Sequence, residues 1–187
     1  EIPLRLVGSE MCIRDRCRLG DCYEYGEGVT KDLVKAAEWY QKAAEQGDAG
    51  AQYKLGKCYY CGKGTEMNNN EAVKWLRRAS EQGVADAQNL LGDCFYYGCG
   101  VETNHWEAVK WYEKAAKQGH AEAQCSLGYC HEYGKGVTKD LAKAAKWYRE
   151  SAENGNEFAQ CNLGLCYEYE KGITKAVSYT HLTLPTI

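Results

Sequence analysis

Apolar residues return along the chain at helical spacing. Within residues 51–61, Leu55 follows Ala51 by four residues, and Cys58 and Tyr59 follow Leu55 by three and four residues. Such spacing places them on one face of an α-helix, because residues one turn apart lie above one another. The pattern therefore predicts a helix with one buried side.

A glycine turn and a second helix follow each helix of this kind. Gly62 and Gly64 allow the backbone to reverse. The second helix stops at a Gln-Gly pair such as Gln46-Gly47, where glycine accepts a left-handed conformation. Its predicted first residues can cap the free N–H groups of a first turn. They are Asp32, Asn68, Asn104 and Asp140.

The two-helix unit repeats every 36 residues. Residues 17–52 and 125–160 align without a gap and share 23 of 36 residues, which indicates tandem duplication. The Leu-Gly pair of the first helix (helix A) returns at Leu19, Leu55, Leu91, Leu127 and Leu163. A tryptophan of the second helix (helix B) returns at Trp39, Trp75, Trp111 and Trp147. We expect these tryptophans to pack between helices, and we expect Trp106, which departs from the column, to be exposed.

Composition and charge narrow the class of protein. The chain has 15 Tyr, 11 Cys and 5 Trp among 187 residues but only 2 Phe, so small and aromatic side chains must fill the core. A net charge of -3 argues against a nucleic-acid-binding protein, which needs clustered Lys and Arg. No run approaches the roughly 20 apolar residues that span a bilayer. We therefore expect neither nucleic acid nor a membrane as a partner of this sequence.

The consensus AxAQxxLGxCYxYGxGVxKDxxKAAxWYxKAAEQG resembles the Sel1-like repeat, a relative of the tetratricopeptide repeat with a longer turn between its helices. The resemblance covers residues 17–175, about four and a half repeats. It implies an all-α fold, an α/α superhelix (solenoid) of 36-residue helix-turn-helix repeats, with helix A lining the concave side. It also implies an adaptor that holds other proteins.

The two ends of the chain do not follow the repeat. Residues 1–16 (EIPLRLVGSEMCIRDR) and 176–187 (AVSYTHLTLPTI) fit none of its columns. Both resemble translated sequencing-adapter DNA, so we interpret them as non-native and exclude them from the fold. The alternative is a pair of irregular caps. On the first interpretation, we expect the natural protein to be longer at both ends.

The cysteines are predicted to be packing thiols. One column holds Cys22, Cys58, Cys94, Cys130 and Cys166. Equivalent residues of adjacent repeats lie roughly 8–10 Å apart, beyond the roughly 7 Å between Cα atoms that a disulfide tolerates. We expect a reducing compartment such as the cytoplasm. Cys58 and Cys61 form a C-x2-C pair, half of a zinc or redox site, but no second pair completes four ligands.

No catalytic motif stands out, so we predict no catalytic residue, no metal and no cofactor. HExxH and GxSxG are absent, and the glycines of residues 25–28 recur in other repeats as turns. The secreted cysteine-rich branch of the family includes β-lactam-binding members. It carries paired cysteines at columns that match Ala44 and Gln52, and both cysteines are absent here. A small-molecule binder or hydrolase of that type is the alternative function.

Repeat positions (columns) whose residue changes from one repeat to the next are available to bind a partner. Columns whose residue stays the same (fixed columns) are expected to pack the repeats against one another, in what we call the stack. On helix A the changing positions follow i, i+4 and i+7, which makes one stripe. The predicted partner-binding residues are Asp21, Glu24, Tyr53, Lys57, Tyr60, Asn89, Asp93, Tyr96, Tyr129 and Glu132. Central tyrosines with acidic neighbours suit a protein or peptide segment that bears basic residues. The alternatives are a solvated face without a partner and a purely structural spacer.

Overall fold

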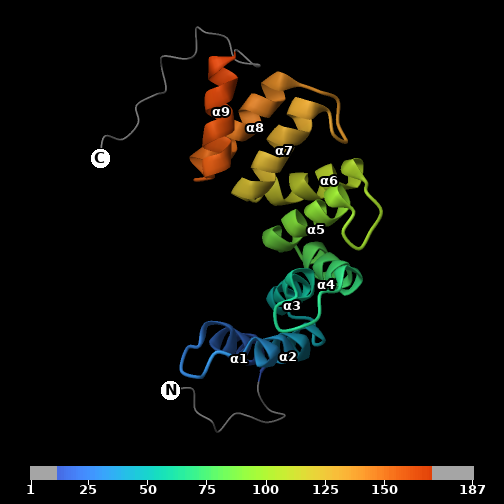
Figure 1. Cartoon of the computed structure of the whole chain (residues 1–187), viewed down its shortest axis with the longest axis vertical. Helices are drawn as coiled ribbons and strands as arrows, with labels where there is room; N and C mark the ends of the chain where they lie inside the picture. Colours follow the sequence, from blue (N-terminus) through green and yellow to red (C-terminus); the bar gives the residue numbers. More distant parts are fainter. Residues whose placement is uncertain (1–11, 170–187) are drawn as a thin grey trace, which may run out of the picture. The chain divides into compact units, whose positions relative to one another are not determined.

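A computed structural model describes residues 12–169, which form nine helices and no strand (Figure 1). The helices are α1 (Ile13–Tyr25), α2 (Leu33–Ala44), α3 (Ala49–Cys61), α4 (Asn69–Glu81), α5 (Ala85–Tyr97), α6 (His105–Ala116), α7 (Ala121–Tyr133), α8 (Leu141–Glu153) and α9 (Glu157–Glu168). Residues 1–11 and 170–187 lie outside the described part. They include most of both terminal segments that we interpreted as non-native and the end of the predicted array. The first turn of α1 belongs to the segment 1–16.

The predicted ends of helix A and starts of helix B are confirmed, whereas α2 ends at Ala44, two residues before the predicted stop at Gln46-Gly47. Helix α3 ends at Cys61 because Gly62 takes φ of 65°, in the left-handed region that suits glycine. Each helix B is capped at its start, since the four predicted side chains accept a hydrogen bond from the backbone N–H three residues later. This bond measures 3.0 Å from Lys35 to Asp32 and 3.1 Å from Glu71 to Asn68. Cap residues and glycines therefore set the helix lengths.

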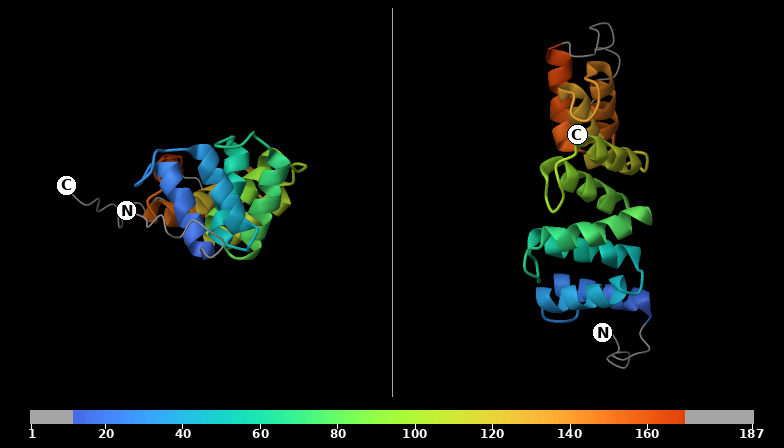
Figure 2. Two further views of the ribbon diagram at one scale, coloured as in Figure 1. Left: turned by 90° about the horizontal axis from the view of Figure 1, so that it is seen from below. Right: turned by 90° about the vertical axis from the view of Figure 1, so that its right-hand side faces the viewer.

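The helices divide into two compact units, residues up to Thr103 and residues from Asn104. In the first unit, α1 packs on α2, α2 on α3, α3 on α4 and α4 on α5. Figure 2 shows the first pair, in blue, side by side. In the second unit, α6, α7, α8 and α9 pack in the same sequential way. Each unit is thus built from neighbours in sequence.

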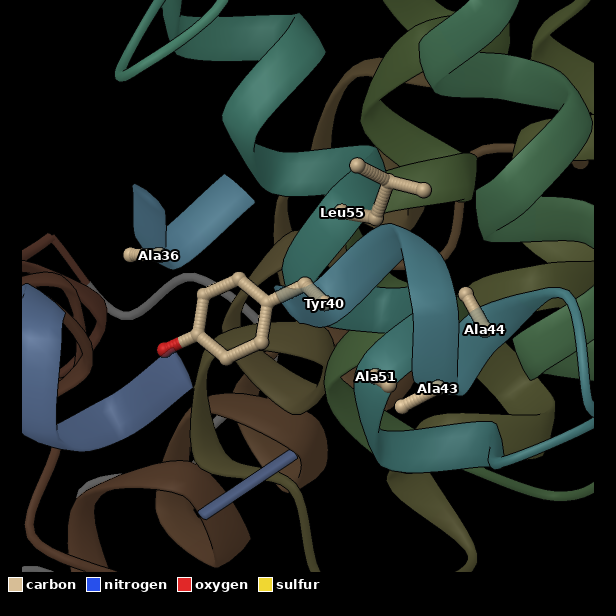
Figure 3. Close-up of a cluster of buried hydrophobic side chains, with 6 residues drawn as sticks. All are labelled: Ala36, Tyr40, Ala43, Ala44, Ala51 and Leu55. Carbon is tan, nitrogen blue, oxygen red and sulfur yellow. The ribbon is translucent and has the colours of Figure 1, made fainter. Parts of the chain in front are cut away.

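Alanine and glycine bring the helices of each unit close together. Figure 3 shows the cluster around Tyr40, which lies among alanines of α2 and α3 together with Leu55. A Cβ atom on Gly20 would lie 2.5 Å from Cε1 of Tyr40, and one on Gly56 would lie 2.9 Å from Cγ of Leu76. The glycine of the Leu-Gly pair therefore leaves room for a large side chain from helix B at Gly20, Gly56 and Gly128.

The tryptophan column is less buried than a role confined to packing would require. Trp111 is buried, whereas Trp39 and Trp75 are half-buried. A cation three residues further along covers each of these three rings: Nζ of Lys42 lies 4.2 Å from the ring centre of Trp39, and Nζ of Lys114 lies 3.8 Å from that of Trp111. In the fourth repeat, Glu150 stands three residues after Trp147 instead. Trp106 is 57% exposed, as the sequence predicted.

Candidate partner-binding surface

The structure places the first helices of successive repeats side by side within each unit. In the first unit, Lys54 of α3 forms an ion pair with Asp21 of α1. The hydroxyl of Tyr60, also on α3, lies close enough to the thiol of Cys99, which follows α5, for that thiol to raise its pKa. We call the solvent-facing side chains of α1, α3 and α5, and separately those of α7 and α9, the helix-A surface. All ten predicted partner-binding residues lie on these helices.

Two of the predicted acidic residues are engaged with the core. The hydroxyl of Tyr40 lies 2.7 Å from Oδ1 of Asp21 and 2.5 Å from Oε2 of Glu24. Its ring is fully buried, and Figure 3 shows the hydroxyl pointing away from Ala43, Ala44 and Ala51. Burial first, then the two carboxylates, raises the pKa of Tyr40. Asp21 and Glu24 therefore hold a buried phenol in place in addition to facing solvent.

The second unit repeats this arrangement. Tyr148 of α8 is fully buried and donates a hydrogen bond of 2.9 Å to Oε2 of Glu132. In the second repeat, where helix B carries Leu76 at the tyrosine position, helix A carries Tyr60 at the glutamate position. The third repeat differs, since helix B carries Tyr112 while helix A carries Tyr96 at the glutamate position. Glu24 and Glu132, which we assigned to recognition, thus also serve packing in the first and fourth repeats.

Tyr53 and Lys57 form the central part of the surface on α3. Tyr53 is half-buried, and burial is the main cause that raises its pKa, against the opposing effect of Lys57. Lys57 is exposed, and its Nζ lies 5.9 Å from the ring centre of Tyr53. The ammonium group therefore stands in solvent beside an aromatic ring, where an acidic or aromatic side chain of a partner can reach it.

The neighbouring part of the surface combines α3 with α5. Burial, followed by the thiols of Cys99 and Cys94, raises the pKa of Tyr60 to about 12. Tyr96 lies edge-on to Tyr97, with 4.9 Å between the ring centres. The Oδ1 atom of Asn89 is buried and accepts no hydrogen bond among residues 12–169. Asp93 lies close enough to Tyr60 to contribute to its raised pKa.

A fixed column of exposed tyrosines escaped the sequence reasoning. It closes the first helix of four repeats, with exposures of 66% at Tyr25, 68% at Tyr97, 54% at Tyr133 and 62% at Tyr169. Cys61, also exposed, takes its place in the second repeat. We had assigned fixed columns to the stack, so these residues were left out. The sequence did contain a sign of their exposure, because each lies four residues after a position that changes between repeats, such as Tyr129. Residues four apart lie on the same face of a helix.

Charge differs between the helix-A surfaces of the two units. Helix α3 carries two lysines, Lys54 and Lys57, and no acidic residue. Helices α7 and α9 carry no Lys or Arg between them. Their acidic residues are Glu122, Glu132, Glu157 and Glu168. The second unit therefore presents an anionic surface.

The described residues also define what chemistry the chain offers. Between Cys12 and Tyr169, no three His, Cys, Asp or Glu side chains are placed to hold a metal ion. All eleven cysteines are free thiols. Burial raises the pKa of Cys94 and Cys130 to about 12, which keeps them as neutral thiols. A search of the described helices for one long and apolar enough to cross a bilayer found none.

Comparison with known proteins identifies the repeat. The Sel1 repeat model matches residues 16–48, 49–84, 85–120, 121–156 and 158–179. A protective antigen of uropathogenic Escherichia coli strains, displaying an SLR fold, is 40% identical with a TM-score of 0.84 over 87% of this chain. A Sel1 repeat protein from Oxalobacter formigenes is also 40% identical, with a TM-score of 0.83 over 87%. This chain spans 35% and 65% of their respective lengths.

More distant likenesses agree on the fold. Cysteine-rich protein B of Helicobacter pylori is 28% identical, with a TM-score of 0.56 over 74% of this chain and 98% of its own. The comparison with curated proteins found no match. The helices, the repeat matches and these structures together show an all-α solenoid of helical repeats. The chain belongs to the Sel1 repeat family.

Proposed function

We propose that this repeat array is a non-catalytic scaffold that holds a protein or peptide segment along its helix-A surface. Sel1 repeats commonly serve protein–protein interaction, and that role suits the side chains on these helices. The observation that carries the proposal is the contrast between the two sides of helix A. Leu127 is fully buried, whereas Tyr129, two residues later, is 43% exposed.

The exposed side chains suit protein recognition. Tyrosine offers a large, rigid contact area together with a polar hydroxyl, and tyrosine is enriched where binding energy concentrates. In the first unit, Lys57 and Tyr53 lie beside Tyr60, and Tyr96 lies on the next helix A. In the second unit, Tyr129 stands beside Glu132. These residues, with Asp21, Glu24, Asn89 and Asp93, are our proposed partner-binding residues.

The alternative function, a β-lactam-type binder or hydrolase, meets an obstacle at Ala44 and Gln52. In the cysteine-rich branch these columns carry the paired cysteines. Here the side chain of Gln52 donates from Nε2 to the carbonyl oxygen of Ala44 at 3.1 Å. Ala44 and Gln52 are both buried. An amide–carbonyl hydrogen bond thus takes the place of the covalent link that characterises that branch.

Photo-crosslinking tests the scaffold proposal on the whole chain. We would introduce a benzophenone amino acid at Lys57 or Tyr129, both on the helix-A surface. Matched control positions on or next to helix B are Trp106 and Lys117, which are also exposed. We expect one protein to be linked from the helix-A positions and not from the controls. Equal labelling from both sets would contradict the proposal, and nitrocefin hydrolysis by the chain would favour the alternative.

A further inference from the structure

The carboxyl ends of α7 and α9 form an exposed aromatic edge in the second unit. Tyr133 and Tyr169, at the last helical position or just after it, are 54% and 62% exposed. One turn earlier, Tyr129 and Leu165 are 43% and 41% exposed. The rings of Tyr129 and Tyr133 lie 4.5 Å apart and are tilted by 39°. We call these four residues the tyrosine edge.

Packing holds the two helices beside each other. Cys125 of α7 packs against the cluster that contains Ala159 and Cys166 of α9. Asn162 of α9 lies close enough to this thiol to influence its pKa. Figure 1 shows both helices next to α8. Since α7 and α9 occupy equivalent places in successive repeats, their carboxyl ends point the same way and lie on the same side of the unit.

Three sources of negative potential converge on this edge. Glu132 and Glu168 each precede a tyrosine of the edge by one residue. The carboxyl end of a helix carries a partial negative charge, and both tyrosines stand at such an end. The face of a phenol ring is itself negative. Neither of the two last turns contains Lys or Arg to compensate.

These features fit a cation that has an extended flat surface. A guanidinium group stacks on aromatic faces, donates hydrogen bonds to carboxylates and is more weakly hydrated than an ammonium group. We propose that the tyrosine edge binds arginine side chains of the segment held by the helix-A surface. The inference rests on the proposed function, because it names the chemistry of that segment.

The spacing of the two helices sets the spacing of the arginines. Helices in contact lie about 8–10 Å apart, and a polyproline II segment advances about 3.1 Å per residue with about three residues per turn. Arginines three residues apart in such a segment lie on the same side and therefore reach Tyr133 and Tyr169 in turn. On the helix-A surface of the first unit, the exposed Lys57 of α3 would repel such a segment. The arginines are thus directed to the second unit.

Peptide binding to the whole chain tests this inference. The probe is a fluorescent peptide of about ten residues with Arg at every third position, compared with one that has neutral citrulline instead. We expect the arginine peptide to bind about tenfold more tightly, and more weakly as salt increases. The variant Tyr133→Ala/Tyr169→Ala should lose this preference. Tyr133→Phe/Tyr169→Phe, which keeps both rings, should retain it within about threefold.

Each contrary result has its own meaning. Trp106→Ala removes an exposed aromatic side chain from helix B and should leave binding unchanged. Equal affinity for the two peptides, lost in the alanine variant, would overturn the cation preference while leaving the helix-A surface as the docking site. Arginine-peptide binding that survives the alanine variant, or no measurable binding, would overturn the inference itself. Crosslinking from Lys57 and Tyr129 decides the scaffold proposal independently.

Discussion

The side-chain amides of Gln52 and Gln82 meet across thirty residues of sequence, with Nε2 of Gln82 donating to Oε1 of Gln52 at 2.8 Å. Gln52 in turn donates to the last carbonyl of α2, at Ala44. The second unit repeats the bond, since Nδ2 of Asn154 donates to Oε1 of Gln124 at 2.9 Å. In these two repeats, a buried glutamine thus satisfies the end of one helix B and joins it to the end of the next.

This amide link predicts a loss of stability on substitution. Gln52→Leu would remove two hydrogen bonds, one to the Ala44 carbonyl and one from the Gln82 amide, although both groups keep a bond to the backbone of Gly47. At about 0.5–1.5 kcal/mol for each bond, the loss in the free energy of unfolding should be about 1–3 kcal/mol. Urea unfolding followed by circular dichroism measures it. Gln160→Leu is the matched control, because Gln160 occupies the same column and is exposed. A cost equal to that of the control would refute the amide link.

The Leu-Gly column predicts opposite effects at two of its glycines. A Cβ atom on Gly128 would lie 2.5 Å from the ring of Tyr148, so Gly128→Ala should destabilise the chain by about 1–3 kcal/mol. Gly164 has nothing within 4 Å of its Cβ position. There Gly164→Ala should be neutral or stabilising by up to about 1 kcal/mol, because alanine favours helix. Thermal unfolding of both variants distinguishes them, and equal effects would argue against the packing described.

Stability should fall at high pH because of the buried tyrosines. Burial, followed by Glu132, raises the pKa of Tyr148 above its value near 10 in an unfolded chain. The contribution is fully present below about pH 10 and is lost as pH rises, because only the unfolded state then ionises. Tyr148→Phe should flatten this alkaline loss and cost about 1–3 kcal/mol at neutral pH.

Urea unfolding at several pH values gives the comparison. Tyr133→Phe serves as its control, since Tyr133 is exposed and should leave the alkaline loss as it is. If the free energy of unfolding falls by the same amount at high pH in Tyr148→Phe and in the wild type, the role of the Glu132 contact is contradicted.

Thiol reactivity should follow burial. Cys61 and Cys161 are exposed, whereas Cys94 and Cys130 are buried with pKa raised to about 12. At pH 8 a smaller fraction of the buried pair is ionised to thiolate, the reactive form, than of a thiol with an ordinary pKa. Alkylation of the folded chain, mapped by mass spectrometry, should label the exposed pair first and the buried pair only on unfolding. Early labelling of Cys94 or Cys130 would mean that this packing opens readily.

Local pattern was sufficient to predict the helices and their ends. The caps at Asp32, Asn68, Asn104 and Asp140 depend only on nearby residues, so the sequence located them. The fold followed because each helix packs on its neighbours in sequence.

Contacts across helices were beyond the sequence pattern. Nothing near Glu24 in sequence indicates that it accepts a hydrogen bond from Tyr40, sixteen residues away. The assignment of fixed columns to the stack failed at Tyr25 and Tyr97, because duplication also copies residues whose environment is solvent. A repeated residue therefore marks a repeated environment, buried or exposed.

The central claim is that the helix-A surface is where the chain holds its partner. Once crosslinking has identified the partner, its affinity for the variant Lys57→Glu/Tyr129→Ala tests the claim most directly. Titration calorimetry should show a loss of about tenfold or more for this variant. The control Lys117→Glu/Trp106→Ala, with the same substitutions next to and on helix B, should bind like the wild type. Unchanged affinity for the helix-A variant, or an equal loss in the control, would contradict the account.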